Sequence, residues 1–180
     1  MKGVIETLFE QFHTEDVWFE AETQNPSYHP GRCAKVFAGG KEIGVFGQIH
    51  PAVAANYGVE AEIYCAELSF EAMLEVKGGL PVYQPLPKFP ASTRDIAVVC
   101  DAGIPVAKLA RCIENAGGKY LEQVELFDVY QGKGVAEGKK SVAFNLTLRA
   151  EDRSLTGEEA EASVKKILEA LEQEYSAVLR

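Results

Sequence analysis

Residues Lys140–Arg149 read KSVAFNLTLR, and from Ser141 onward small or polar side chains alternate with large apolar ones. Val142, Phe144, Leu146 and Leu148 would share one face of a strand, because successive side chains of an extended chain point to opposite sides. The opposite face would hold the remaining residues, Ser141, Ala143, Asn145, Thr147 and Arg149. This pattern predicts a strand with one face in a hydrophobic core and one face without large hydrocarbon side chains.

The quoted strand is flanked by other regular elements in the second half of the chain. Thr156 and Glu159 form the T-x-x-E pattern of a capping box, which predicts the start of a long helix. The expected elements, in chain order, are a strand at 95–100, a helix from 105 to 117, a strand at 120–130, the quoted strand, a helix from 156 and a strand at 175–179. This order, β-α-β-β-α-β, is typical of ferredoxin-like α+β folds, in which right-handed crossovers place both helices on one side of an antiparallel sheet.

The first half of the chain also mixes helices and strands, but it supplies few elements for its many apolar side chains. The expected elements are a helix at 2–12, a hairpin of strands 33–38 and 42–49 around Gly39-Gly40, a short helix at 51–57 and a strand at 63–70. We therefore predict a partial α/β piece of a larger sheet domain.

A proline-rich segment, VKGGLPVYQPLPKFP at 76–90, joins the two halves. Proline and glycine at this density disfavour both a helix and a central strand. The sequence therefore predicts a domain at 1–78, a linker at 79–90 and a second domain at 91–180.

The charge is distributed unevenly along the chain. Of a net charge of −9, residues 1–78 contribute −7 (5 basic and 12 acidic side chains) and residues 85–180 contribute −2 (13 basic and 15 acidic). This balance argues against indiscriminate nucleic-acid binding. A nucleic-acid site in the second half would have to be local and specific.

Four cysteines and three histidines occur without metal-ligand spacing. No CxxC pair is present, and Cys65, Cys100 and Cys112 sit in apolar runs, which favours buried thiols in a reducing cytoplasm. We expect no metal site. No apolar run approaches the roughly 20 residues of a membrane span, and the start of the chain lacks the features of a signal peptide.

Two sets of motifs carry a resemblance to a known family. KFPASTRDIAVV (88–99), LFDVYQGKGVAEGKKSVAFNLTLRA (126–150) and TGEEAEASVKKILEAL (156–171) resemble the ferredoxin-fold anticodon-binding domain of the phenylalanyl-tRNA synthetase β subunit. NPSYHPGRCAKVFAGGKEIGVFGQIHPAVAANYGVEAEIYCAEL (25–68) resembles the end of the class II synthetase-like core of the same subunit. This resemblance implies a turn at HPGR (29–32). The resemblance covers nearly the whole chain, in the order of the family.

The resemblance implies a role within a larger enzyme. Such an enzyme is an (αβ)₂ ligase that uses ATP and Mg²⁺ to charge tRNA-Phe in the cytoplasm, and its active site belongs to the α subunit. The β core is not the catalytic copy. The resemblance therefore implies that this chain contributes anticodon recognition and has no catalytic residue, metal site or cofactor of its own.

Asp128 and Ser141 are the first candidates for contact with an anticodon. Asp128, at the end of a predicted strand, is either a turn aspartate or an acceptor for the ring N–H and amine of a guanine. Ser141 opens the quoted strand on its polar face, where its short hydroxyl would leave room for a base. The resemblance implies that both positions face the anticodon loop.

The other candidates flank these two in the sequence. The resemblance places Pro90 and Ala91 beside the anticodon, although they also fit the end of the linker. Arg94 would pair with an acid such as Asp95 or reach a phosphate. The last three candidates are the densest group of basic residues outside the acidic helix: Lys133, Lys139 and Lys140. These lysines either are simply solvated or contact phosphates.

Alternative functions remain for a ferredoxin-like domain, because fold alone does not determine function. A protein-interaction or oligomerisation module without an RNA role is the main alternative, and a pull-down would separate it from a tRNA binder. An RRM is disfavoured because the one aromatic residue of the quoted strand falls on its core side. An acylphosphatase-like hydrolase is disfavoured because no glycine-rich arginine loop precedes the first strand.

Overall fold

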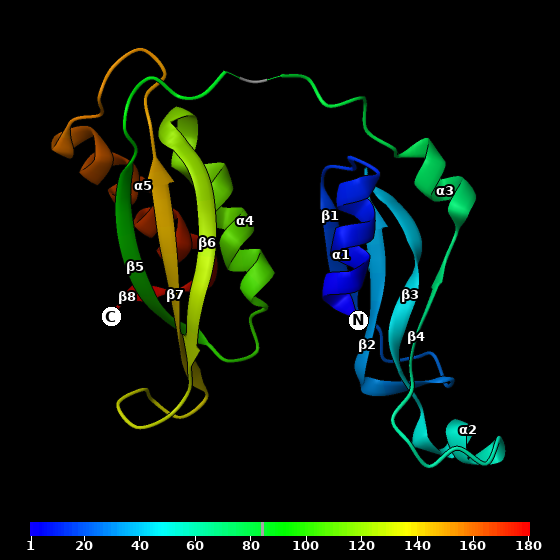
Figure 1. The fold of residues 1–180 in the computed structure, drawn as a ribbon. Helices are drawn as coiled ribbons and strands as arrows, with labels where there is room; N and C mark the ends of the chain where they lie inside the picture. Colours follow the sequence, from blue (N-terminus) through cyan, green and yellow to red (C-terminus); the bar gives the residue numbers. More distant parts are fainter. Residues whose placement is uncertain (84) are drawn as a thin grey trace. The chain divides into compact units, whose positions relative to one another are not determined.

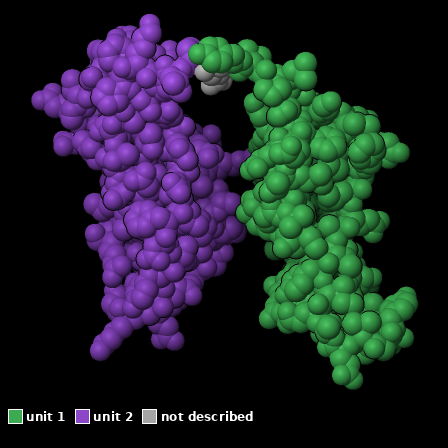
Figure 2. Space-filling model, viewed as in Figure 1, with its two compact units in different colours: residues 1–84 green, residues 85–180 purple. Residues whose placement is uncertain are grey.

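The computed structural model describes residues 1–83 and 85–180 of the chain. They form two compact units, 1–84 and 85–180, which Figure 2 shows in different colours. The division falls inside the stretch 79–90 that the sequence predicts to be a linker. None of the helices in the described part of the chain combines the length and apolar character that crossing a membrane requires.

The second unit is a four-stranded antiparallel sheet with strand order β6-β7-β5-β8 (Figure 1). Its elements, in chain order, are β5 (Ser92–Asp101), α4 (Val106–Gly117), the 3₁₀ helix η1 (Gly118–Tyr120), β6 (Leu121–Tyr130), β7 (Lys139–Leu148), α5 (Gly157–Tyr175) and β8 (Val178–Leu179). This confirms the predicted β-α-β-β-α-β order and the ferredoxin-like fold class.

The core of this unit lies between the sheet and its two long helices. Val142, Phe144, Leu146 and Leu148 of β7 have no exposed surface, which confirms the alternation read from the sequence. Each such side chain stabilises the fold by about 1.5–3 kcal/mol through burial. The helices contribute fully buried side chains to the same core: Leu109 and Ile113 of α4, and Ile167 and Leu171 of α5.

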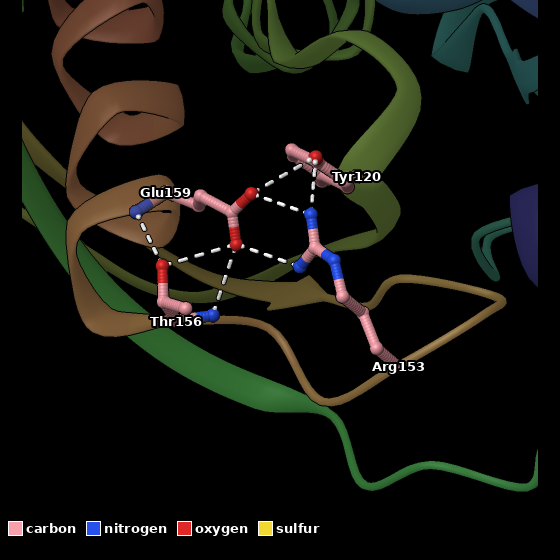
Figure 3. A network of polar contacts seen from close by, with 4 residues as sticks. All are labelled: Tyr120, Arg153, Thr156 and Glu159. Carbon is pink, nitrogen blue, oxygen red and sulfur yellow. Dashed lines mark hydrogen bonds and ion pairs between the residues drawn. The ribbon is translucent and has the colours of Figure 1, made fainter.

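A polar network holds the start of α5 in place (Figure 3). The predicted capping box is present: the Thr156 hydroxyl accepts from the Glu159 amide at 3.3 Å, and the Glu159 carboxylate accepts from the Thr156 amide at 3.1 Å. Arg153 donates to both carboxylate oxygens of Glu159, at 2.8 and 2.6 Å, and the Tyr120 hydroxyl donates at 3.2 Å. Hydrogen bonding from Arg153 and then from Thr156 lowers the pKa of Glu159 to about 2.

The end of the chain differs from the prediction of a strand at 175–179. Tyr175 is the last residue of α5, and only Val178–Leu179 pairs with β5. Tyr175 packs against the core, and Ser176, with a φ of 50°, ends the helix in the left-handed region. The helical spacing of apolar residues thus extends further than predicted.

The first unit is a four-stranded antiparallel meander, in the order β1-β2-β3-β4, with α1 packed on one face. The predicted N-terminal helix, the hairpin around Gly39-Gly40 and the short helix at 51 are confirmed. β1 and α3 were not predicted. The elements are α1 (Lys2–Gln11), β1 (Val17–Ala21), β2 (Tyr28–Ala38), β3 (Lys41–Ile49), α2 (Pro51–Asn56), β4 (Tyr64–Leu68) and α3 (Phe70–Glu75).

The prediction of a turn at HPGR was wrong, because residues 29–32 lie inside β2. The pairing of β2 with β3 is irregular between Tyr28 and Cys33, and the Gly31 amide donates to His29 Nδ1 at 3.1 Å instead. Arg32 lies 3.2 Å from a Glu62 carboxylate oxygen.

Candidate nucleic-acid interface

One side of the sheet in the second unit points away from α4 and α5, and we call it the open face. Residues paired across the sheet share a face, so the strand register defines its members. They are Thr93, Asp95, Ala97, Val99 and Asp101 of β5, Gln123, Glu125, Asp128 and Tyr130 of β6, Lys139, Ser141, Ala143, Asn145 and Thr147 of β7, and Val178 of β8. The predominance of small and polar side chains agrees with the sequence prediction for β7.

Asp128 reaches the open face through an irregularity in β6. Leu126 pairs with the buried Phe144, whereas Asp128 pairs with Ala143 of the open face, so the register shifts at Phe127. In a regular strand, residues two positions apart share a face, and Asp128 would then point toward the helices. A β-bulge of this kind turns a side chain to the other face. The extra residue therefore places the exposed Asp128 carboxylate on the open face.

Tyr130 also reaches the open face because of this bulge, and it pairs directly with Ser141. Tyr130 is 37% exposed, and its hydroxyl donates to the Lys133 carbonyl at 3.1 Å. Asp128 lies diagonally across from Ser141, a relation that separates Cα atoms by about 7–8 Å. The open face thus brings together a carboxylate, a hydroxyl and an aromatic ring within the span of one nucleotide base.

Tyr130 was not among the residues singled out from the sequence. The sequence LFDVY does not show on which face of the sheet Tyr130 lies, because that depends on the bulge at Phe127. Ser141 lies where predicted but is only 4% exposed, so it is not a solvent-facing residue in this state.

The three candidate lysines do not form one cluster. Lys133 is exposed on the β6–β7 loop, and Lys139 lies 4.0 Å from the Asp101 carboxylate at the same end of the sheet. Lys140 is only 7% exposed, and its ammonium donates to the Ile104 carbonyl. Lys140 alternates with Ser141, so it points to the helix side, and the expected grouping of all three lysines has to be corrected.

Comparison with known proteins identifies the two units. Residues 87–180, more than half of the chain, match the family model described as "Ferredoxin-fold anticodon binding domain". The chain belongs to this family. Residues 1–70 match the family model described as "Phenylalanyl tRNA synthetase beta chain CLM domain". The resemblance inferred from the sequence is thereby confirmed.

Relatives of this anticodon-binding domain protein are named phenylalanine–tRNA ligase beta subunit. Those of Symbiobacterium thermophilum, Moorella thermoacetica and Clostridium tetani are 45%, 42% and 39% identical to the chain over 95%, 100% and 100% of its length. The alignments cover 19%, 22% and 23% of these relatives. The chain therefore spans about a fifth of the length of the relatives it matches.

The remaining candidates lie at the other end of the anticodon-binding domain's sheet. Pro90 and Ala91 directly precede β5, about eight residues before the position that pairs with Ser141, which is roughly 26 Å along a strand. The Phe89 carbonyl accepts from Arg149, whose Nε lies 2.7 Å from Glu122. This contact ties the segment before β5 to the sheet.

Arg94 does not lie on the open face, where a residue that contacts a phosphate of the bound RNA would be expected. It pairs with the buried Leu146 and therefore belongs to the helix side of the sheet. Its Nη1 donates to the Ser92 hydroxyl and the Thr93 carbonyl, both at 2.9 Å. Asp95 accepts from Asn145 at 2.7 Å. The site geometry therefore centres on Asp128, Tyr130 and Ser141.

Proposed function

We propose that the open face binds the anticodon loop of tRNA-Phe, and that the chain does so as part of a longer phenylalanine–tRNA ligase β subunit. The observation that supports this most directly is the bulge at Phe127, which turns Asp128 and Tyr130 to the same side as Ser141. The family match and the names of the relatives support the choice of tRNA-Phe.

The chemistry of the three residues suits an unstacked guanine. Its Watson–Crick edge offers a ring N–H and an amine, and the two oxygens of the Asp128 carboxylate can accept from both. The Tyr130 ring offers a stacking surface, and base–aromatic stacking contributes about 1–3 kcal/mol per base. Ser141, small and adjacent, leaves space for the base and can hydrogen-bond to it.

Further candidates extend this site in the proposal. Lys133 and Lys139 would contact phosphates beside the loop, and Pro90 and Ala91 would meet the nucleic acid at the far end of the sheet. Lys140 and Arg94 are kept as residues that support the site from the helix side, since their cationic groups bind backbone carbonyls and, for Arg94, a neighbouring hydroxyl.

The ligase chemistry is assigned to other parts of the assembly in this proposal. Among the described residues, no group of three or more His, Cys, Asp or Glu side chains could hold a metal ion. An α subunit in an (αβ)₂ enzyme would supply the active site. A cytoplasmic location is supported by the free thiols of Cys33, Cys65, Cys100 and Cys112.

Titration of the chain with the anticodon stem-loop of tRNA-Phe tests the proposal. Asp128→Asn should weaken binding about 10- to 100-fold, since a hydrogen bond to a charged group is worth about 1.5–3 kcal/mol. Replacing the anticodon guanine by inosine, which lacks the amine, should weaken binding to the unaltered chain and have a much smaller effect on the variant. Glu114→Gln on α4 is the charge-matched control and should bind normally.

Two results would contradict the proposal. One is equal affinity for the tRNA-Phe stem-loop and for a stem-loop with an unrelated anticodon. The other is an equal effect of Asp128→Asn and Glu114→Gln, since that would trace the loss to net charge and not to the open face.

A further inference from the structure

The side chain of Arg180 extends over the open face toward Tyr130. The backbone amide of Arg180 donates to the Ala97 carbonyl at 2.9 Å, next to β8 at one edge of the sheet. Its guanidinium carbon nevertheless lies 5.7 Å from the centroid of the Tyr130 ring, which belongs to β6 at the other edge. The two side chains therefore extend toward each other over the inner strands β5 and β7 and meet above the open face.

Part of the middle of the open face is buried although α4 and α5 lie on the other side. Ser141 and Ala143 of β7 are only 4% and 8% exposed. Ser141 is the neighbour of Tyr130 in the sheet, and Ala143 lies between Ala97 and Asp128 in the next row. Both rows lie under the path from Arg180 to the Tyr130 ring.

We propose that Arg180 is the second wall of the base site, with the Tyr130 ring as the first wall and the Asp128 carboxylate at the edge between them. This inference rests on the proposed anticodon function and adds a residue to it. A guanidinium plane stacks on a base as an aromatic ring does, and it adds a cation–π contribution. The base would be held on both faces while its edge is read by Asp128.

The distance between the two walls is close to what a base requires. A base in contact on both sides needs about 3.5–4.0 Å on each, hence about 7–8 Å between the walls. The guanidinium carbon stands at 5.7 Å from the ring centroid, so it has to withdraw by about 1–2 Å. Arg180 is exposed, and its long side chain allows a displacement of this size.

Binding of the tRNA-Phe anticodon stem-loop to the chain, measured over a series of salt concentrations, tests the role of Arg180. Arg180→Ala and Arg180→Lys should both weaken binding about two- to fivefold, the range of a cation–π contact at an exposed site. For Arg180→Lys the slope of log affinity against log salt should stay unchanged, because the charge is kept and only the planar stacking group is lost. In a Tyr130→Leu background, Arg180→Ala should have little further effect, since a wall acts only with its partner. Arg111→Ala on α4 removes an arginine from the other side of the sheet and is the matched control.

The possible outcomes separate this inference from the proposed function. Absence of preferential binding by the unaltered chain would overturn the proposed function and this inference with it. If binding is preferential, three results overturn the inference alone. One is a full restoration of affinity by lysine, which indicates a phosphate ligand. Another is tighter binding of Arg180→Ala, which indicates an obstruction. The third is an effect no larger than that of Arg111→Ala.

Discussion

The two faces of β7 differ as sharply as neighbouring residues of one strand can. On the helix side, Phe144 and Leu146 are fully buried among hydrocarbon side chains, whereas Asn145 between them lies on the open face and donates to Asp95. The helix side supplies much of the free energy of folding, and in the proposed function the open face supplies the groups for recognition. The two tasks are separated by a single residue step, so substitutions at adjacent positions should affect different properties.

The largest expected effect is on stability. Phe144→Ala should destabilise residues 85–180 by about 3–5 kcal/mol, because it removes a large side chain without any exposed surface and leaves a cavity. Asn145→Ala, its neighbour on the open face, removes one exposed hydrogen bond and should cost about 0.5–1.5 kcal/mol. Urea unfolding followed by the amide NMR signals of residues 85–180 measures both. Similar losses of unfolding free energy in the two variants would contradict the proposed difference between the two faces of β7.

The next effect concerns recognition in the assembled ligase. Asp128→Ala should raise the KM for tRNA-Phe about 10- to 100-fold, corresponding to the loss of a charged hydrogen-bond partner. ATP–phenylalanine exchange should be unchanged, because the proposal assigns that chemistry to the α subunit. A parallel loss of both activities would point to failed folding or assembly instead of a lost anticodon contact.

The third effect separates lysines that are close in sequence but lie on opposite faces. Lys133→Ala combined with Lys139→Ala should reduce the salt dependence of tRNA binding by about 0.7–0.9 per lost phosphate contact on a log–log scale. Lys140→Met should leave this slope unchanged, because its ammonium is bound to the Ile104 carbonyl on the helix side. If Lys140→Met alone reduced the slope, the assignment of faces would have to be revised.

The smallest effect is a pH dependence on the helix side. The Arg153 guanidinium and the Thr156 amide lower the pKa of Glu159 to about 2, from an ordinary value of 4.5. A lowered pKa means that the carboxylate stabilises the fold fully above about pH 4.5 and loses this contribution as the pH falls toward 2. Glu159→Gln should therefore reduce the acid sensitivity of unfolding in this range.

The charge-matched control for this test is Glu169→Gln, which changes an exposed i,i+4 pair with Lys165 on the same helix. It should keep the acid sensitivity of the unaltered chain. Equal pH profiles of unfolding for Glu159→Gln and the unaltered chain would show that the network in Figure 3 contributes little to stability.

Much of the second unit could be predicted because its signals are local. The strict alternation of residues 140–148 fixed both the strand and its buried face, and the T-x-x-E pattern located the start of α5. The same alternation already placed Lys140 with Val142 and Arg94 with Ile96, on the helix side. Grouping the lysines by their distance along the chain obscured this signal.

Other features could not be predicted because they depend on pairing between strands. YLEQVELFDVY gives no sign that Phe127 is the extra residue, so the faces of Asp128 and Tyr130 remained undetermined. The contact between the Arg180 guanidinium and the Tyr130 ring joins residues at the two opposite edges of the sheet, so it cannot be read from the local sequence. In the first unit, Ser69 was an available signal for the start of α3, since its hydroxyl accepts from the Ala72 amide. The capping-box pattern is incomplete there, because position 72 holds alanine and not glutamate or glutamine.

The extra residue in β6 also has a consequence for how such a surface can change. In a strand without the extra residue, every second side chain along the whole strand faces the core. Inserting or deleting one residue would then move all the following side chains to the opposite face, so the apolar ones would become exposed. Because β6 contains the extra residue Phe127, the faces on which the residues after it lie are determined independently of the faces of the residues before it. Moving the irregularity by one position, from Phe127 to Asp128, would turn Phe127 outward in place of Asp128 while the inward residues stay the same, which under the proposed function offers a route to altered base preference by design.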